Sequence, residues 1–176
     1  MPRSIAFLRA INVGGARIIK MEDLRKHFEM PGLKNVVTYI QSGNVLFDSA
    51  ATDTSALEEK IEKKLLKLLG YEVTTVVRSI AEMEATVKAD PFKKERAEGD
   101  KYYVVFLKEA PAKDLQKELL AFNNAVDTFY IKGKDLYWLC RKGKGESIVS
   151  SSFFEKKLKV PATNRNWNTV NKVLTL

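Results

Sequence analysis

Two glycine-containing segments carry the side chains best suited to hold a polar or anionic ligand. The first is Asn12-Val-Gly-Gly15 with Arg17 beyond it, and the second is Gln41-Ser-Gly-Asn44. Glycine lets backbone N–H groups approach a ligand, amides supply donors and acceptors, and a guanidinium binds phosphate or carboxylate. The predicted ligand-binding residues are Asn12, Gly14, Gly15, Arg17, Gln41, Ser42 and Asn44, with Arg165 as a further member.

A second interpretation of the same segments needs no ligand. Asn12-Val-Gly-Gly15 is also typical of a tight strand-to-helix turn, and Gln41-Ser-Gly-Asn44 of a hairpin turn. Backbone geometry would then explain the glycines, although a turn does not need Gln41 or Arg17 beside it. Both interpretations stay open at the level of sequence.

Arg165 is the residue near the C-terminus that packing explains least. The segment Arg165-Asn-Trp-Asn-Thr169 gathers donor groups around one indole, and we expect it to start the last helix. Trp167 falls on the apolar stripe of that helix, which indicates a core anchor, and either Asn166 or Thr163 is the expected N-cap. Neither role requires a guanidinium.

Positive charge is concentrated in the last third of the chain. The whole chain carries +8, and Lys132 to Lys172 contains ten Lys/Arg against three Asp/Glu, a net +7. We expect Arg141, Lys142 and Lys144 to form an exposed patch with little carboxylate compensation, suited to an anion or to nucleic acid. The alternative is a solvated loop without a partner.

Several classes of chemistry lack the residues they need. His27 is the one histidine and Cys140 the one cysteine, so no zinc-type ligand set, catalytic triad or Cys–His pair is indicated. Neither GxxxxGK[ST] nor GxGxxG is present. We therefore predict no metal and no cofactor. Because no acid–base pair stands out, the sequence favours a binding function over an enzyme.

The composition indicates the cytoplasm and no membrane association. No run approaches the roughly 20 apolar residues that span a bilayer. The short apolar N-terminal run is interrupted by Arg9 and Asn12, unlike a signal peptide. A single cysteine cannot form an internal disulfide, which fits a reducing compartment.

The first half of the chain predicts the element order βαββαβ. Apolar patterns, turn residues and helix-end signals place its elements at Ile5–Leu8, 20–29, Val36–Ile40, Val45–Phe47, Ser55–Leu69 and Val73–Val77. The helix-end signals are capping boxes at Ser55-Ala-Leu-Glu58 and Ser79-Ile-Ala-Glu82 and a C-cap at Gly70. This is the ferredoxin-like order. Its first and second strands run parallel, so the segments after them, which hold Asn12 and Gln41, should lie at the same end of the sheet.

The second half repeats much of this pattern without a clear final strand. Predicted strands are Tyr102–Leu107, Thr128–Ile131 and Leu136–Cys140, with helices after Pro111 and Ser152. We therefore expect an α+β protein with two ferredoxin-like subdomains and mostly antiparallel sheets. The predicted division is 1–78 for the first, 79–100 for a helix and linker, and 101–176 for the second with a C-terminal helix.

Motifs along nearly the whole chain carry a resemblance to a known family. They are Leu8-Arg-Ala-Ile-Asn-Val-Gly-Gly15, Thr38-Tyr-Ile-Gln-Ser-Gly-Asn-Val45, Asp90-Pro-Phe92 and Thr163-Asn-Arg-Asn-Trp-Asn-Thr-Val170. The chain resembles a bacterial family of uncharacterised proteins, a domain of unknown function whose members begin LRGINVGG and end with RNWNTV. The resemblance implies a two-subdomain α+β fold and no known reaction. Ala10 and Asp90 depart from it, since the family usually has glycine and often asparagine there.

Besides an enzyme with carboxylate or amide chemistry, three functions are compatible with the sequence. The first is binding of a small anionic ligand, a nucleotide or a phosphorylated metabolite, at the Asn12 and Gln41 loops. The second is a nucleic-acid-binding accessory protein that uses the basic C-terminal third. The third is a structural or partner-binding protein.

Overall fold

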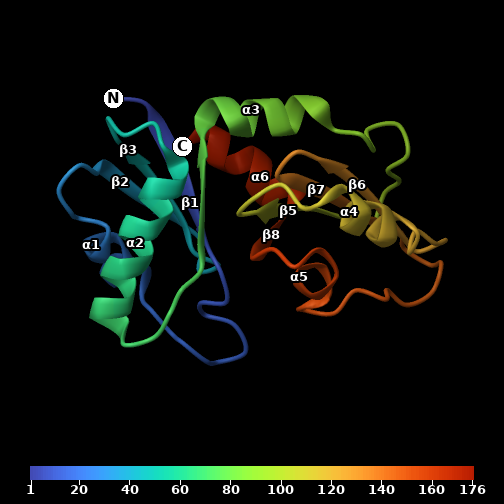
Figure 1. Ribbon diagram of the computed structural model, residues 1–176, viewed down its shortest axis with the longest axis horizontal. Coiled ribbons are helices and arrows are strands. Elements are labelled where there is room, and N and C mark those ends of the chain that lie inside the picture. The colour runs from blue at the N-terminus through green and yellow to red at the C-terminus, as the bar shows by residue number, and fades with distance from the viewer. The chain divides into compact units, whose positions relative to one another are not determined.

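A computed structural model describes all residues, 1–176, and divides the chain into two compact units (Figure 1). The first unit comprises Met1–Ala85 and Lys172–Leu176, and the second comprises Thr86–Asn171. The sequence predicted divisions at 78/79 and 100/101. In the structure the chain passes between units inside helix α3, Ile80–Ala89, and again at the end of helix α6, Trp167–Lys172.

The first unit has the predicted order βαββαβ. Its elements are β1 (Arg3–Leu8), α1 (Met21–His27), β2 (Lys34–Tyr39), β3 (Asn44–Asp48), α2 (Thr54–Leu69) and β4 (Thr75–Ser79). The sheet order is β2-β3-β1-β4, and every neighbouring pair is antiparallel. The short 3₁₀ helix η1, Val173–Thr175, at the C-terminus also belongs to this unit.

The second unit has the same topology and does contain a final strand. Its elements are β5 (Lys101–Leu107), α4 (Lys113–Leu120), β6 (Asp127–Lys132), β7 (Asp135–Cys140), α5 (Phe153–Leu158) and β8 (Ala162–Asn166). The order β6-β7-β5-β8 repeats that of the first sheet. The prediction that this strand is missing was wrong. The sequence Thr163-Asn-Arg-Asn166 lacks apolar alternation, and antiparallel pairing with β5 makes it a strand.

Each unit has its own helix-covered core. In the first, Ala6, Leu8, Val45 and Phe47 alternate along their strands and pack under the helices. Figure 1 shows α1 and α2 on the same side of this sheet. The helix residues Leu24, Leu57, Ile61 and Leu65, with Phe28 at the C-cap of α1, complete this core. The second core is built around Leu107, Leu119, Phe129, Leu136, Trp138, Phe154 and Leu158.

Helix ends follow local hydrogen-bonding rules, with one correction. Ser79 and Glu82 form the predicted capping box: the Glu82 N–H donates to Ser79 Oγ at 3.2 Å, and the Ser79 N–H donates to Glu82 Oε2 at 2.8 Å. Gly70 ends α2 in the left-handed conformation, also as predicted. However, α2 is capped by Asp53 and not by Ser55, because the Asp53 carboxylate accepts from the first free N–H groups of the helix.

None of the helices combines the length and the apolar character that a bilayer-spanning segment needs.

Candidate functional site

The two predicted loops of the first unit do lie together at one end of its sheet. The Leu8 N–H donates to the Gly43 carbonyl at 2.8 Å, and Asn12 Nδ2 donates to the Gln41 carbonyl at 2.9 Å. This neighbourhood follows from the parallel orientation of β1 and β2 on either side of β3.

The Asn12 amide joins three backbone segments. Besides Gln41, Nδ2 donates to the Ile19 carbonyl at 3.0 Å, and Oδ1 accepts from the Ile19 N–H at 2.7 Å. Asn12 thus fastens both ends of its own loop and the neighbouring hairpin. Most of its hydrogen-bonding capacity is used inside the protein.

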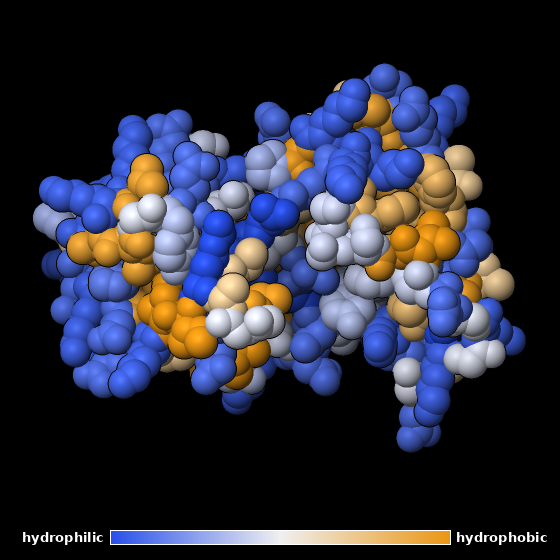
Figure 2. Space-filling model, turned by 90° about the horizontal axis from the view of Figure 1, so that it is seen from below, coloured by the Kyte–Doolittle hydropathy of each residue, from blue (hydrophilic) through white to orange (hydrophobic).

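Gly14 and Gly15 form the tip of a miniature hairpin. Val13 and Ala16 form a β-bridge around them, and both glycines have positive φ, 60° and 75°, as a type I′ turn requires. Nearby Val13 and Ile18 are 62% and 74% exposed. Figure 2 shows the face on which this loop lies, with apolar groups exposed among hydrophilic ones. The loop around Gly14 and Gly15 therefore exposes both backbone groups and apolar side chains to solvent.

The other predicted residues of this end differ in what they offer a ligand. Arg17 turns toward the connection before β4, where its guanidinium lies 4.8 Å from the Tyr71 ring centroid and donates to the Glu72 carbonyl at 3.4 Å. Asn44 is buried, and its Nδ2 donates to the Tyr39 carbonyl and to Ser42 Oγ, both at 2.9 Å. The Gln41 side chain is exposed.

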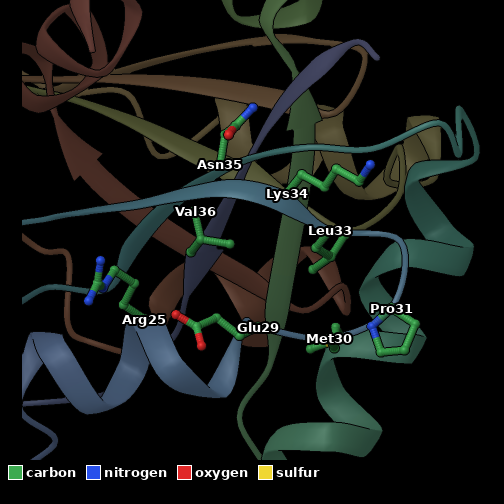
Figure 3. Close-up of a pocket in the computed structure, with 8 residues that line it drawn as sticks. All are labelled: Arg25, Glu29, Met30, Pro31, Leu33, Lys34, Asn35 and Val36. Atoms are coloured by element: carbon green, nitrogen blue, oxygen red, sulfur yellow. The ribbon is translucent and has the colours of Figure 1, made fainter.

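A cavity of about 510 Å³ lies between α1 and β2 in the same unit (Figure 3). Figure 3 shows Leu33 and Val36 pointing to the α1 side of the strand, whereas Lys34 and Asn35 point to the other side. Asn35 Nδ2 donates to Asp48 Oδ2 at 2.7 Å. Because its polar groups diverge, this cavity offers no convergent set for a ligand.

The second unit contains a cavity whose polar and aromatic groups do converge. Its volume is about 550 Å³, within the range typical of small-molecule sites. Two segments some sixty residues apart in the sequence supply its lining: Arg96, Ala97, Asp100, Lys101, Tyr102, Tyr103, Asn166, Trp167 and Asn168.

An aromatic pair and a guanidinium form the centre of this cavity. The rings of Tyr102 and Trp167 lie 4.7 Å apart between centroids, at 35°. The Arg96 guanidinium carbon lies 4.6 Å from the Tyr102 centroid and 5.3 Å from that of Trp167, within cation–π range. Trp167 is half-buried, so part of its ring remains accessible.

Asp90 holds Arg96 and Tyr102 in place by hydrogen bonds. Arg96 Nη1 donates to both Asp90 oxygens at 2.8 Å, which leaves Nη2 and Nε for a ligand or water. The Tyr102 hydroxyl donates to Asp90 Oδ1 at 2.8 Å. Burial, together with the Asp90 carboxylate, raises the pKa of Tyr102 well above its usual range, so the phenol stays protonated.

Asp100 connects the rim of the cavity to the basic loop. Its carboxylate accepts from the Ala97 N–H at 2.9 Å and the Lys142 N–H at 3.0 Å, and these two bonds lower its pKa. Lys142 and Lys144 are exposed, as predicted. Arg141 differs from the prediction, because its guanidinium pairs with Glu95 at 3.3 Å and donates to Thr128 Oγ1 at 2.6 Å. Two of the three predicted cations therefore lack a carboxylate partner.

Arg165 lies in β8 and not at the start of the last helix. It is 6% exposed, and its Nη1 donates to Thr163 Oγ1 and to the Asn164 carbonyl, both at 2.8 Å. Burial lowers the pKa of Arg165 to about 10. Asn166 does cap α6, since its Oδ1 accepts from the Thr169 N–H at 2.8 Å. Arg165 belongs to the second unit and Asn12 to the first, so a shared site stays a prediction.

Cys140 and His27 have no partners that would make them reactive. Cys140 is half-buried at the end of β7, where burial raises the pKa of its thiol and keeps it protonated. His27 is half-buried on α1. The structure contains no group of three or more His, Cys, Asp or Glu side chains placed to hold a metal ion.

The sequence reasoning did not select Arg96, Lys101 or Tyr102. Two motifs next to the cavity were predicted only as marks of a resemblance: Thr163–Val170, which supplies part of the lining, and Asp90-Pro-Phe92, whose Asp90 holds Arg96 and Tyr102. The sequence alone did not show that these segments lie side by side, because the pairing of β5 with β8 brings them together.

Comparison with known proteins adds a family and a fold. The profile of DUF1697, described as a protein of unknown function, matches residues 1–137. The chain belongs to this family. A conserved bacterial protein from Streptococcus pneumoniae, SP0830, has a similar structure with a TM-score of 0.73 and 24% identity, over 99% of this chain and 97% of that one. This likeness concerns the fold alone. No curated protein matches the chain.

Proposed function

We propose that this DUF1697 protein binds a small ligand that combines a planar ring with an anionic group, such as a nucleotide. The observation that carries the proposal is the cavity of the second unit, where an accessible indole, a guanidinium, a lysine and two side-chain amides converge. We propose binding and no reaction. Among the residues that line the cavity, the pKa of Tyr102 is raised and that of Asp100 is lowered, so neither group is suited to exchange a proton near neutral pH.

The chemistry of each group fits a part of such a ligand. A base can stack on the accessible part of Trp167, a contact worth about 1–3 kcal/mol in single-stranded nucleic-acid complexes. The exposed Asn168 amide can match donors and acceptors on a ring edge, and Asn166, whose Oδ1 caps α6, can add its Nδ2 as a donor. Lys101 and the outer nitrogens of Arg96 supply positive charge for a phosphate.

The Asn12 and Gln41 loops are a second candidate for a small anionic ligand, nucleotide or phosphorylated metabolite. The favouring observation is backbone strain: Ala10, Asn12, Arg17 and Ile40 all have φ between 48° and 55°. Left-handed conformations in non-glycine residues are costly and gather at functional sites. Against this, Asn12 and Asn44 use their amides to hold the loops.

The proposed setting is the cytoplasm, which the single cysteine favours. If neither a small ligand nor an oligonucleotide binds, a structural or partner-binding role becomes the favoured function.

The test is isothermal titration calorimetry of the intact protein with mono-, di- and triphosphate nucleosides and with sugar phosphates. We expect Trp167→Ala to abolish binding and Lys101→Ala to weaken it about tenfold, the effect of losing one charge-assisted contact of about 1.4 kcal/mol. The matched control is Lys113→Ala, an exposed lysine on α4. If Gln41→Ala weakens binding while Lys101→Ala does not, the ligand belongs to the loops of the first unit.

A further inference from the structure

We infer that the physiological ligand is a single-stranded nucleic acid, with one base in the cavity of the second unit and the following phosphates along the loop 141–145. The inference rests on the proposed function and names its ligand class. The observation that supports it is that the basic loop is attached directly to the rim of the cavity.

The loop is fixed to the cavity rim by direct contacts. The Lys142 N–H donates to Asp100 Oδ1, and Asp100 lines the cavity. The Lys142 side chain lies so close to Gly99 that a Cβ at that glycine would come within 2.7 Å of Lys142 Cδ. Lys101 pairs in register with Cys140, the residue before the loop. The path from Lys101 to Lys142 is therefore short and fixed by strand pairing.

The charges along this path suit a phosphate backbone. Lys101, Lys142 and Lys144 are exposed and have no carboxylate partner. Of the nearby acids, Asp100 is engaged by two backbone N–H groups and Glu95 by Arg141, whereas Glu98 is exposed. Three exposed ammonium groups without a carboxylate partner are therefore available on the cavity rim and the loop, and Glu146 is the exposed acid directly after the loop.

The aromatic pair selects single strands over a duplex. Its accessible surface lies inside a cavity, which only an unstacked base can enter. In the paired strands of a duplex the bases face inward, so their rings cannot reach Trp167. An aromatic platform followed by lysines is the general design of proteins that bind single strands without strong sequence preference.

The experiment compares a thymidine monophosphate with twelve-nucleotide oligothymidylate and oligouridylate by fluorescence anisotropy and Trp quenching. We expect the oligonucleotides to bind at least tenfold more tightly. The logarithm of their affinity should fall with the logarithm of salt concentration at a slope of roughly −2, the value for three phosphate contacts on a single strand.

The decisive variant is Lys142→Ala combined with Lys144→Ala. It should bring oligonucleotide affinity down to that of the mononucleotide and reduce the salt slope by roughly 1.4, while mononucleotide binding stays unchanged. The control pair, Lys113→Ala with Lys117→Ala, removes the same charge from exposed positions of α4 and should change nothing.

The outcomes separate this inference from the proposed function. If the mononucleotide binds and the oligonucleotides bind no tighter, the nucleic-acid inference is overturned and the cavity remains a small-molecule site. If the oligonucleotides bind and Trp167→Ala has no effect on any ligand, both the cavity and the inferred path are wrong. If nothing binds at low salt, both are abandoned.

Discussion

At the scale of single residues, side chains of one type serve architecture at some positions and offer free groups at others. Asn12 and Asn44 direct their amides to backbone carbonyls of the loops they belong to. Asn168, in contrast, is exposed on the rim of the second cavity. A sequence shows that an amide is present, whereas its availability depends on which carbonyls the fold brings near.

The role of Asn12 is tested by Asn12→Gly, because glycine accepts the local φ of 52° and the variant loses only the amide. We expect the free energy of unfolding to fall by about 1–3 kcal/mol, as three hydrogen bonds are lost from a partly exposed site. Urea denaturation measures this. The control is Gln41→Ala, whose exposed side chain should matter by less than about 0.5 kcal/mol. Equal stability of all three proteins would contradict the structural role.

Asp100 gives a pH dependence with a definite sign. Its pKa is lowered from the ordinary 3.8 in the folded protein, so its contribution to stability is complete above that value and is lost as the pH falls through the lower, folded pKa. We expect the amide protons of Ala97 and Lys142 to titrate in NMR spectra with a midpoint below 3.8. Asp100→Asn should remove this titration. A midpoint above 3.8 would show that the carboxylate does not hold the basic loop.

At the scale of elements, sequence patterns predicted the strands and helices whose formation depends on local residue patterns and helix-end hydrogen bonds. The two-residue and 3.6-residue periodicities, Gly70 and the Ser79–Glu82 box correctly located the strands and helices of the first unit. β8 was not predicted because Asn164 and Asn166 are disfavoured in strands and Thr163 alone gives no alternating pattern, whereas pairing with β5 orders the segment. The cavity escaped for a related reason: Arg96 and Trp167 meet through this same pairing.

Gly43 tests how closely the loops of the first sheet pack. An added Cβ would lie 2.6 Å from Ile11 Cδ1 and 3.0 Å from Leu8 Cβ, and φ is 85°. Gly43→Ala should therefore combine left-handed strain with overpacking and lose about 2–4 kcal/mol. Gly14→Ala is the matched control: φ is 60° and nothing lies within 4 Å, so strain alone should apply, about 1–2 kcal/mol. Similar losses in thermal unfolding would mean that the Gly43 contacts can relax.

At the scale of the whole molecule, the two sheets have the same strand order, and a buried arginine occupies an equivalent position in each. Thr75 in β4 stands opposite Leu8, the last residue of β1, and Ala162 in β8 stands opposite Leu107, the last of β5. Three residues further along each final strand lie Arg78 and Arg165. Both are almost fully buried, at 2% and 6% exposure. A buried guanidinium at the same place in both halves indicates a shared architectural role.

This equivalence predicts that Arg78→Ala and Arg165→Ala destabilise the protein alike. Each removes a buried charged group together with its hydrogen bonds, to the Val77 carbonyl in one case and to Thr163 and Asn164 in the other. We expect a loss of about 2–4 kcal/mol in urea denaturation for each variant, against little change for Arg25→Ala, an exposed arginine of α1. An Arg165→Ala protein that keeps its stability and loses nucleotide binding would instead return Arg165 to a ligand site and break the equivalence with Arg78.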